Sequence, residues 1–261
     1  MKPFLAVALF CLWGCTFTPG TFGETEGDDP GADAGAGAGP GSGSGSGSGP
    51  GSPVSRSCAF NETELRLCLE FEDRTFTPVT DGSPMRLDAT TKDVSERPRL
   101  GRYAAQFATT SRLTVPESSA LDLTTALTIE MWVFPSWPQP NTLLNNQGQY
   151  RMQIDGGGRI GCQLPNAQVW SPDDEWAPPG EWTFIACTYK PTSSGGELTV
   201  YVDGDVARKE TFANPGLNAN GTSGTTIGEL FAGGIDDIRI YGTALSDETV
   251  CTHAGRTSCA D

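Results

Sequence analysis

The sequence predicts a single all-β domain over residues 58–261, and three observations support this prediction. Apolar and polar residues alternate with a period of two along several segments, which is the pattern of half-buried antiparallel strands. Other segments are apolar in both registers, as expected for central strands that are covered on both faces. Clusters of Gly, Pro and Asp separate these runs in the way that turns do. The length suits one β-sandwich, and no second linker divides it.

The predicted strands follow one another along the chain. Segment 65–72 has Leu or Phe at every second position, with Arg, Cys or Glu between them. Segments 127–134 (LTIEMWVF) and 182–189 (WTFIACTY) are apolar in both registers, so we expect them to be central strands. Segment 198–203 alternates again, which predicts a second half-buried strand.

Turns and one short helix complete the predicted elements. The run Asp-Gly-Gly-Gly at 155–158 precedes RIGCQL, and the Pro- and Gly-containing segment 191–196 precedes ELTVYV. Asp203-Gly204 follows that strand directly, which is a typical hairpin signal. Only 246–250 (SDETV) predicts a helical turn, with its first serine as the cap.

The first residues predict a lipoprotein signal peptide over 1–14. A lysine precedes an apolar run at 4–13 that is too short to cross a bilayer as a helix but suits an export signal. Gly14-Cys15 follows at once and resembles a bacterial lipobox, in which such a cysteine is lipidated after cleavage. A secretory signal cut elsewhere is the alternative. We expect acyl chains on Cys15 to anchor the exported protein, in the bacterial outer membrane or at the cell surface.

Residues 15–57 predict the lipidated cysteine and a disordered linker. The segment is mostly Gly, Ala, Ser and Pro with a few acids, so it offers almost nothing that could form a core. We expect it to act as a spacer between the membrane and the domain at 58–261.

The charge balance excludes some classes of protein. The chain has 17 Lys and Arg against 32 Asp and Glu, and its formal net charge is −15. This balance argues against a nucleic-acid partner, because phosphate contacts need clustered cations. A single histidine excludes zinc sites with several histidines.

The order of these segments and three sequence blocks resemble a LamG-like jelly-roll domain. The blocks are the Glu-x-Trp strand at 130–132, the pair GEWTFIA and YVDG within 180–204, and GGIDDIRIYGTALS at 233–246. Such domains form the laminin-G/pentraxin-like branch of the concanavalin A-like lectin/glucanase superfamily. The resemblance spans nearly all of 65–250.

The resemblance implies a fold and a range of functions. It implies a β-sandwich of two antiparallel sheets in a jelly roll. Members mostly bind carbohydrate or protein surfaces and often hold calcium, and the superfamily also includes glycoside hydrolases. We therefore expect a cell-envelope domain that binds a glycan or an extracellular or envelope protein without catalysis. The alternatives are a hydrolase-like or degenerate hydrolase domain, and a structural envelope protein without a ligand.

Six cysteines remain in the domain once the signal and Cys15 are set aside. In an exported protein they imply three disulfides out of fifteen connectivities. The resemblance keeps one alternative open, because the first and last strands of such jelly rolls lie side by side and the first two cysteines would then pair with the last two. Sequence proximity and strand position favour Cys58–Cys68, Cys162–Cys187 and Cys251–Cys259. We expect the strands that carry Cys162 and Cys187 to be near neighbours in one sheet.

No catalytic constellation is predicted. Retaining glycosidases need two carboxylates about 5–5.5 Å apart, and the strand that would carry them here offers only Glu130, with Trp132 and Phe134 at the same parity. The single histidine, His253, lies between two cysteines near the C-terminus, and we expect it to be a surface residue.

Three tryptophans are candidate ligand contacts. Trp137, Trp170 and Trp176 lie in Pro-rich connecting segments, where an indole is less easily buried than in a strand. Indole faces stack on sugar rings, so these residues are the expected glycan contacts. Covering the edge of the sandwich is the alternative role.

A structural calcium site is predicted where the first and last strands meet. Alternation places Asp236 toward the core and Asp237 on the outward side. A core-facing carboxylate must be compensated, either by backbone N–H groups or an arginine, or by Ca²⁺. Gly234 would let carbonyl groups approach, and Glu72 and Asp73 would complete the ligand shell if the terminal strands are neighbours, as the resemblance implies.

Overall fold

The computed structural model describes residue 58 and residues 64–137, 140–218 and 223–259. These residues belong to the compact unit Pro50–Asp261. The predicted signal peptide, Cys15 and the predicted linker lie outside the described residues. No helix among the described residues is long and apolar enough to cross a membrane.

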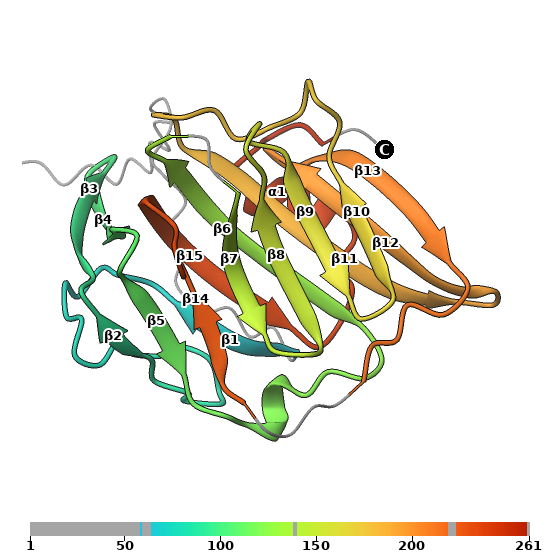
Figure 1. Ribbon diagram of the computed structural model, residues 1–261, viewed down its shortest axis with the longest axis horizontal. Coiled ribbons are helices and arrows are strands. Elements are labelled where there is room, and N and C mark those ends of the chain that lie inside the picture. Colours follow the sequence, from blue (N-terminus) through green and yellow to red (C-terminus); the bar gives the residue numbers. More distant parts are fainter. Residues whose placement is uncertain (1–57, 59–63, 138–139, 219–222, 260–261) are drawn as a thin grey trace, which may run out of the picture. The chain divides into compact units, whose positions relative to one another are not determined.

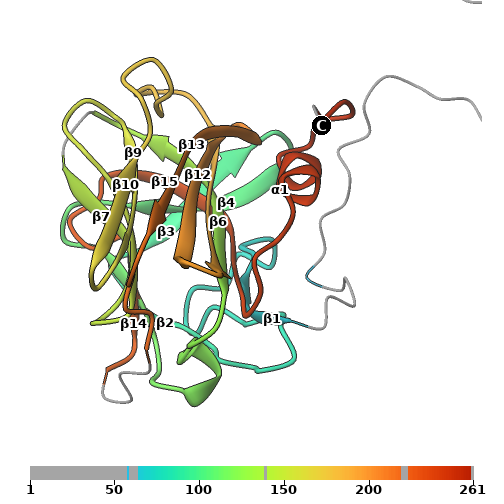
Figure 2. The same ribbon diagram turned by 90° about the vertical axis from the view of Figure 1, so that its right-hand side faces the viewer.

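Two antiparallel sheets pack face to face and confirm the predicted β-sandwich (Figures 1 and 2). The larger sheet has eight strands, in the spatial order β13 (Asp205–Phe212), β12 (Gly195–Val202), β11 (Thr183–Thr192), β6 (Leu127–Pro135), β15 (Gly233–Tyr241), β4 (Arg102–Phe107) and β3 (Ser95–Arg99), with β1 (Leu65–Leu69) paired to β15. The other has seven, in the order β10 (Ala167–Trp170), β9 (Ile160–Leu164), β8 (Tyr150–Ile154), β7 (Asn141–Asn146), β14 (Thr225–Ile227), β5 (Arg112–Val115) and β2 (Thr90–Lys92).

The segments that are apolar in both registers form central strands, as predicted. They become β6 and β11, which pair with each other in the middle of the eight-stranded sheet. One face of this sheet packs against the other sheet, and α1 (Asp247–His253) lies over the outer face (Figure 2). The main core lies between the sheets and includes Leu67, Phe107, Leu113, Ile129, Met131, Leu144, Met152, Ile185, Val200 and Ile240, all at most 1% exposed.

The short helix forms where the sequence predicted it and extends further. The Ser246 hydroxyl accepts a hydrogen bond from the backbone N–H of Thr249 at 3.1 Å, as an N-cap does. The helix then continues to His253, beyond the predicted 246–250. Val250 packs with Phe184 and Tyr201 in a second apolar cluster on the outer face of the eight-stranded sheet. A 3₁₀ turn, η1 (Ser119–Leu121), precedes β6.

The three favoured disulfides are confirmed. Their Cα–Cα distances are 5.9 Å for Cys58–Cys68, 6.0 Å for Cys162–Cys187 and 5.8 Å for Cys251–Cys259. The terminal strands β1 and β15 do pair antiparallel, but the cross-pairing of their cysteines does not occur. The expectation that Cys162 and Cys187 are neighbours in one sheet is wrong, because β9 and β11 belong to different sheets. Their disulfide joins the two layers through the core.

Candidate glycan-binding surface

The outer face of the seven-stranded sheet presents an unbroken row of polar side chains. Along β8 to β10, every second residue points into the core, as Met152, Cys162 and Val169 do. The residues between them point outward, and directly paired residues on antiparallel strands share a face. The strand registers therefore align one polar row across all seven strands: Thr90, Thr114, Thr226, Asn145, Arg151, Gln163 and Gln168.

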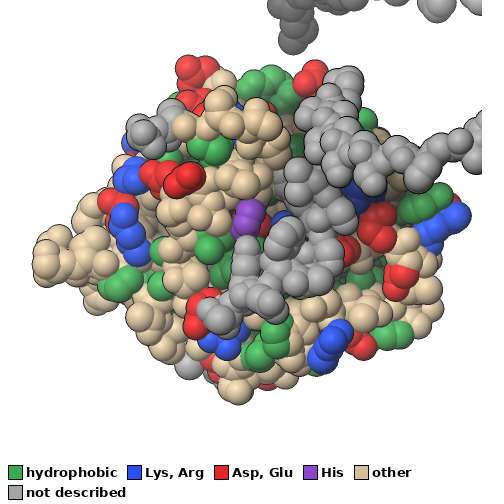
Figure 3. Space-filling model, turned by 180° about the vertical axis from the view of Figure 1, so that it is seen from behind, with side chains coloured by type: hydrophobic (Ala, Val, Ile, Leu, Met, Phe, Trp, Pro, Cys, Tyr) green, Lys and Arg blue, Asp and Glu red, His purple; other side chains and the backbone are tan. Residues whose placement is uncertain are grey.

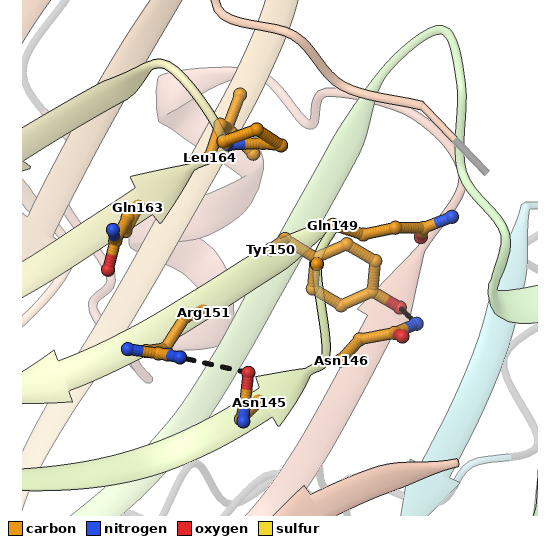
Figure 4. Close-up of a pocket in the computed structure, with 9 residues that line it drawn as sticks. Asn145, Asn146, Gln149, Tyr150, Arg151, Gln163 and Leu164 are labelled. Carbon is orange, nitrogen blue, oxygen red and sulfur yellow. Dashed lines mark hydrogen bonds between the residues drawn. The ribbon is translucent and has the colours of Figure 1, made fainter. Parts of the chain in front are cut away.

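A shallow cleft of about 150 Å³ lies beside the middle of the polar row. Figure 4 shows Asn145, Arg151 and Gln163 on the neighbouring strands that line it, with the Arg151 guanidinium hydrogen-bonded to the Asn145 side chain at 3.4 Å. The Tyr150 hydroxyl turns away from this group, donates to the Leu121 carbonyl at 3.0 Å, and lies 2.9 Å from the Asn146 amide nitrogen. Burial raises the pKa of Tyr150, so its phenol stays protonated. Its hydrogen bond to Leu121 connects β8 to the 3₁₀ turn that precedes β6.

Trp170 forms a flat platform next to the polar row. It is paired with Gly161, and a Cβ atom at position 161 would lie 2.6 Å from indole carbon Cζ3. The ring therefore lies directly over the backbone of β9, which only glycine permits. The neighbouring Gln153 donates its amide to Gln163 at 2.7 Å, so planar amide groups adjoin the indole. A partly exposed indole beside planar polar groups is an arrangement suited to a sugar ring.

Arg159 connects two of the three candidate tryptophans. Its guanidinium lies 5.9 Å from the centre of the Trp170 ring, and it pairs with Asp155 at 2.7 Å and Asp173 at 3.1 Å. The hydrogen bond to Asp155 raises the pKa of Arg159. Trp176 pairs with Arg159 through the backbone, and the residue is 37% exposed.

Trp137 lies in a different loop at the same end of the sandwich. It follows β6, and the pairing of Asn141 with Ile154 places the start of β7 beside the end of β8. The residue is 45% exposed. The structure therefore brings Trp170 and Trp176 together around Arg159, while Trp137 stands in a separate loop. Sequence reasoning missed Gln153, Gln163, Arg151 and Asn145, although the alternation of YRMQI and IGCQL could have indicated their outward direction.

On the opposite sheet, Glu130 is fully buried in a charged cluster. Its side chain is 0% exposed, and its Oε1 lies 3.2 Å from Nη1 of Arg239 and 3.4 Å from the Tyr241 hydroxyl. Nδ1 of His253 lies 2.9 Å from both carboxylate oxygens. The prediction that His253 is a surface residue is therefore wrong: its side chain is only 17% exposed, because α1 carries it against the sheet. Figure 3 shows this histidine, the only one of the chain, on the face that carries α1.

Two further carboxylates lie near Arg239 rather than near Glu130. The Nη2 atom of Arg239 lies 3.7 Å from Glu70 and 4.0 Å from Asp237, which is on the same strand, β15. Burial alone would lower the pKa of Arg239, but Glu130 and Asp237 outweigh it and raise the pKa. Burial, followed by the nearby Asp237, raises the pKa of Glu70. Because Glu130 has no exposed surface, a polysaccharide cannot reach its carboxylate.

The predicted direction of Asp236 is wrong, because β15 contains a bulge. The register shifts between Asp236 and Arg239, and Asp237 adopts a φ of 48°. Asp236 is paired with Trp132 and points to the outer side of the sheet, where Arg99 donates to it at 2.5 Å. Arg102 donates to Asp237 at 3.2 Å. An arginine, one of the alternatives considered for the core-facing carboxylate, therefore contacts each of the two aspartates.

The predicted calcium ligands do not converge in the described structure. Glu72 accepts a hydrogen bond from Arg102 at 2.5 Å, and Asp73 instead accepts from Thr75 at 2.7 Å. Space beside Gly234 is filled by Trp182. Among the described residues, the only three ligand-type side chains within 4.8 Å of one another are Cys58, Cys68 and Glu70, and the two cysteines form a disulfide. This residue set does not fit a calcium shell, and calcium binding itself stays a prediction.

The comparisons with known proteins agree with this fold. Residues 107–251 match the family model described as the concanavalin A-like lectin/glucanases superfamily, and the chain belongs to this superfamily. No curated protein matches the chain.

Several solved structures share the architecture at low sequence identity. The binding domain of Paraclostridial Mosquitocidal Protein 1 aligns with a TM-score of 0.61 and 15% identity, over 74% of this chain and 52% of that one. Domain 4 of an extracellular arabinanase from Geobacillus stearothermophilus, solved with arabinotriose, aligns with a TM-score of 0.58 and 17% identity, over 73% of this chain and 98% of that one. Botulinum neurotoxin type C, described as interacting with two ganglioside molecules, aligns with a TM-score of 0.57 and 13% identity, over 74% of this chain and 51% of that one. The chain thus spans about half the length of the toxin chains, and the likeness shows the fold alone.

Proposed function

We propose that this chain is a cell-envelope lipoprotein whose domain binds a glycan, without catalysis, on the outer face of the seven-stranded sheet. The observation that carries the proposal is Trp170, whose indole lies over Gly161 beside the amides of Gln153 and Gln163. An aromatic face supplies apolar contact to a sugar ring, and planar amides supply hydrogen bonds to its hydroxyl groups.

Two relatives in fold support a carbohydrate ligand. One was solved with arabinotriose, and another is described as interacting with gangliosides. Because identity is below 20% in both, the residues that bind sugar in those proteins do not transfer to this chain. The residues named here rest on the geometry of this chain alone.

Binding to a glycan array tests the proposal. Full-length protein in detergent is applied to an array, and the affinity for each bound glycan is then measured for the wild type and for Trp170→Ala and Gly161→Val. The valine would push the indole off the strand. We expect both variants to weaken binding about 2- to 12-fold, since an aromatic stacking contact contributes about 0.5–1.5 kcal/mol. Val206→Ala, which alters an exposed side chain on β13, is the control.

The outcomes separate the proposed function from its rivals. Binding to no glycan contradicts the proposal and favours a protein ligand or a structural role. Undiminished binding in both variants shows that the glycan binds elsewhere. The same array glycans are assayed for release of reducing ends: we expect none, and release that disappears in Glu130→Gln would favour the hydrolase alternative.

A further inference from the structure

The seven-stranded sheet differs in charge from the rest of the chain. None of its seven strands contains Asp or Glu, whereas the chain has 32 acidic residues and the eight-stranded sheet carries seven of them in its strands. The same seven strands contain three cations, Lys92, Arg112 and Arg151. The sheet that bears the Trp170 platform is therefore locally basic in an acidic protein.

The three cations share the outer face of the sheet. Arg151 is a member of the polar row. Lys92 and Arg112 each stand two residues from a threonine of that row, so they point to the same side. Figure 1 shows the seven strands side by side across the front of the molecule, with α1 behind them.

These cations have no carboxylate partner among the residues that the structure describes. Arg159, which directly precedes β9, differs from them because Asp155 and Asp173 already pair with it. Lys92 and Arg112 are exposed and directly opposite each other on β2 and β5. Like charges in this position repel and destabilise a sheet, and an anionic ligand would remove that repulsion.

The distances between Arg112, Arg151 and Trp170 across the sheet suit a chain of sugars rather than one sugar. Neighbouring strands lie about 4.8 Å apart, so β5 and β8, which carry Arg112 and Arg151, are about 14 Å apart. The Trp170 strand β10 lies about 10 Å further on. One extended ligand can therefore contact two cationic positions and the indole.

The negative net charge of the protein does not prevent an anionic ligand from binding to this face. At an ionic strength of about 0.15 M, interactions are screened over about 8 Å. The acids of the eight-stranded sheet stand about one sheet spacing, about 10 Å, behind the basic face. Figure 3 shows that the reverse side of the molecule carries both acidic and basic side chains.

We infer that the outer face of the seven-stranded sheet binds a polysaccharide whose sugars carry carboxylate or sulfate groups. Arg112 and Arg151 receive the anionic groups, since guanidinium groups pair with them through two parallel hydrogen bonds, and Trp170 stacks on one ring. The inference rests on the proposed glycan-binding function and specifies its ligand class.

Matched polymers that differ only in charge test the inference. Full-length protein in detergent is titrated with polygalacturonate and with its fully methyl-esterified form, and with dextran sulfate and dextran. We expect at least one anionic polymer to bind 10-fold or more tightly than its neutral counterpart, with an affinity that falls as salt rises. The polymer that shows this preference distinguishes carboxylate from sulfate.

The variants locate the binding face. Arg112→Gln/Arg151→Gln is expected to weaken binding of the anionic polymer at least 10-fold. Arg74→Gln/Arg208→Gln changes the net charge equally, at exposed arginines of other segments, and is expected to leave the affinity unchanged. Thermal unfolding of all variants confirms that each is folded.

Each contrary result has its own meaning. Equal binding of charged and neutral polymers overturns the anionic class but leaves the proposed glycan function intact. Equal loss in both double variants, or equal binding of polyglutamate, shows non-specific charge attraction and overturns the inference. Binding to no polymer here and to no glycan on the array overturns the inference and the proposed function together.

Discussion

Arg239 joins three carboxylates on the outer face of the eight-stranded sheet. It is 3% exposed and lies within 4.0 Å of Glu130, Glu70 and Asp237. A buried ion pair adds little compared with apolar residues of the same shape, because both charges lose their hydration. Removing one partner is different, since the remaining charge stays buried without compensation.

We therefore expect Arg239→Met to lower the free energy of unfolding by about 3–5 kcal/mol. Urea unfolding at neutral pH measures it. The double variant Arg239→Met/Glu130→Leu should recover part of the lost stability, because it also removes the buried carboxylate that has lost its guanidinium partner. Arg208→Met, at an exposed pair with Glu210, should change stability by about 0.5 kcal/mol or less. Equal effects of Arg239→Met and Arg208→Met would contradict the buried-cluster interpretation.

Asp236 predicts a pH dependence of stability. Burial, and then the neighbouring Asp237, raise the pKa of Asp236 to about 7, while Arg99 opposes the shift. The folded protein thus holds this proton more tightly than the unfolded chain, where an aspartate has a pKa of about 3.9. The contribution of Asp236 to the free energy of unfolding is therefore fully present below about pH 4 and is lost as pH rises toward about 7.

The measurement compares the wild type with Asp236→Asn. Urea unfolding is followed from about pH 4 to about pH 8, and the stability of the wild type minus that of the variant should fall as pH rises. A difference that stays constant or rises over this range would show that Arg99 outweighs burial at this carboxylate.

At the level of the elements, alternation predicted β1 and β12 and the apolar runs predicted β6 and β11, but neither pattern predicted the bulge in β15. The residues of β6 and β11 are apolar on both sides, so their central position follows from the sequence. In β15 the same rule placed Asp236 in the core, since nothing in GGIDDIRIY indicates that Asp237 adopts a left-handed φ of 48°. A bulge reverses the direction of every side chain on one side of it, which is why this one residue misplaced the predicted site.

The candidate surface was only partly predictable for a different reason. Trp170 and Trp176 stood out because the sequence placed them in Pro-rich connecting segments, where an indole is less easily buried. For Trp170 that placement is wrong, because it is the last residue of strand β10. Their neighbours Gln153 and Gln163 are ordinary outward residues of strands, and they gain meaning only through the register that places them beside Gly161 and Trp170. Register depends on pairing between distant segments, which no local pattern contains.

The Cys162–Cys187 disulfide connects the two sheets and predicts a measurable difference between disulfides. Removing it as Cys162→Ala/Cys187→Ala should cost about 2–5 kcal/mol. It closes a loop with a sequence separation of 25, against 8 for Cys251–Cys259. In the loop-entropy model, removing the shorter loop by Cys251→Ala/Cys259→Ala should cost about 1 kcal/mol less. Urea unfolding of both double variants gives the comparison, and a larger loss for the C-terminal disulfide would contradict the model.

At the scale of the whole domain, the two sheets have different surroundings. The outer face of the eight-stranded sheet is covered by α1 and by a buried network of charges, so its polar groups serve stability. The outer face of the seven-stranded sheet keeps Arg151, Gln163 and Trp170 partly exposed. This division explains why Glu130, the one carboxylate of the strand where a glycosidase of this superfamily would carry two, is buried. It also explains why the proposed ligand face lies on the other sheet.

A ligand face of this kind acts at the envelope only if the chain is anchored there, and the sequence predicts that Cys15 is the anchor. Gly14-Cys15 directly follows the apolar run of the signal, where a lipobox would end. We expect Cys15→Ser to leave the precursor uncleaved or to release soluble protein, because the acyl chains that hold it would be missing. Membrane fractionation and intact mass of the mature protein measure this. Cys11→Ser is the matched control: Cys11 follows the bulky Phe10 within the apolar run, so its replacement should leave both cleavage and fractionation unchanged. A mature N-terminus other than an acylated Cys15 in the wild type would contradict the anchor and favour a secreted protein.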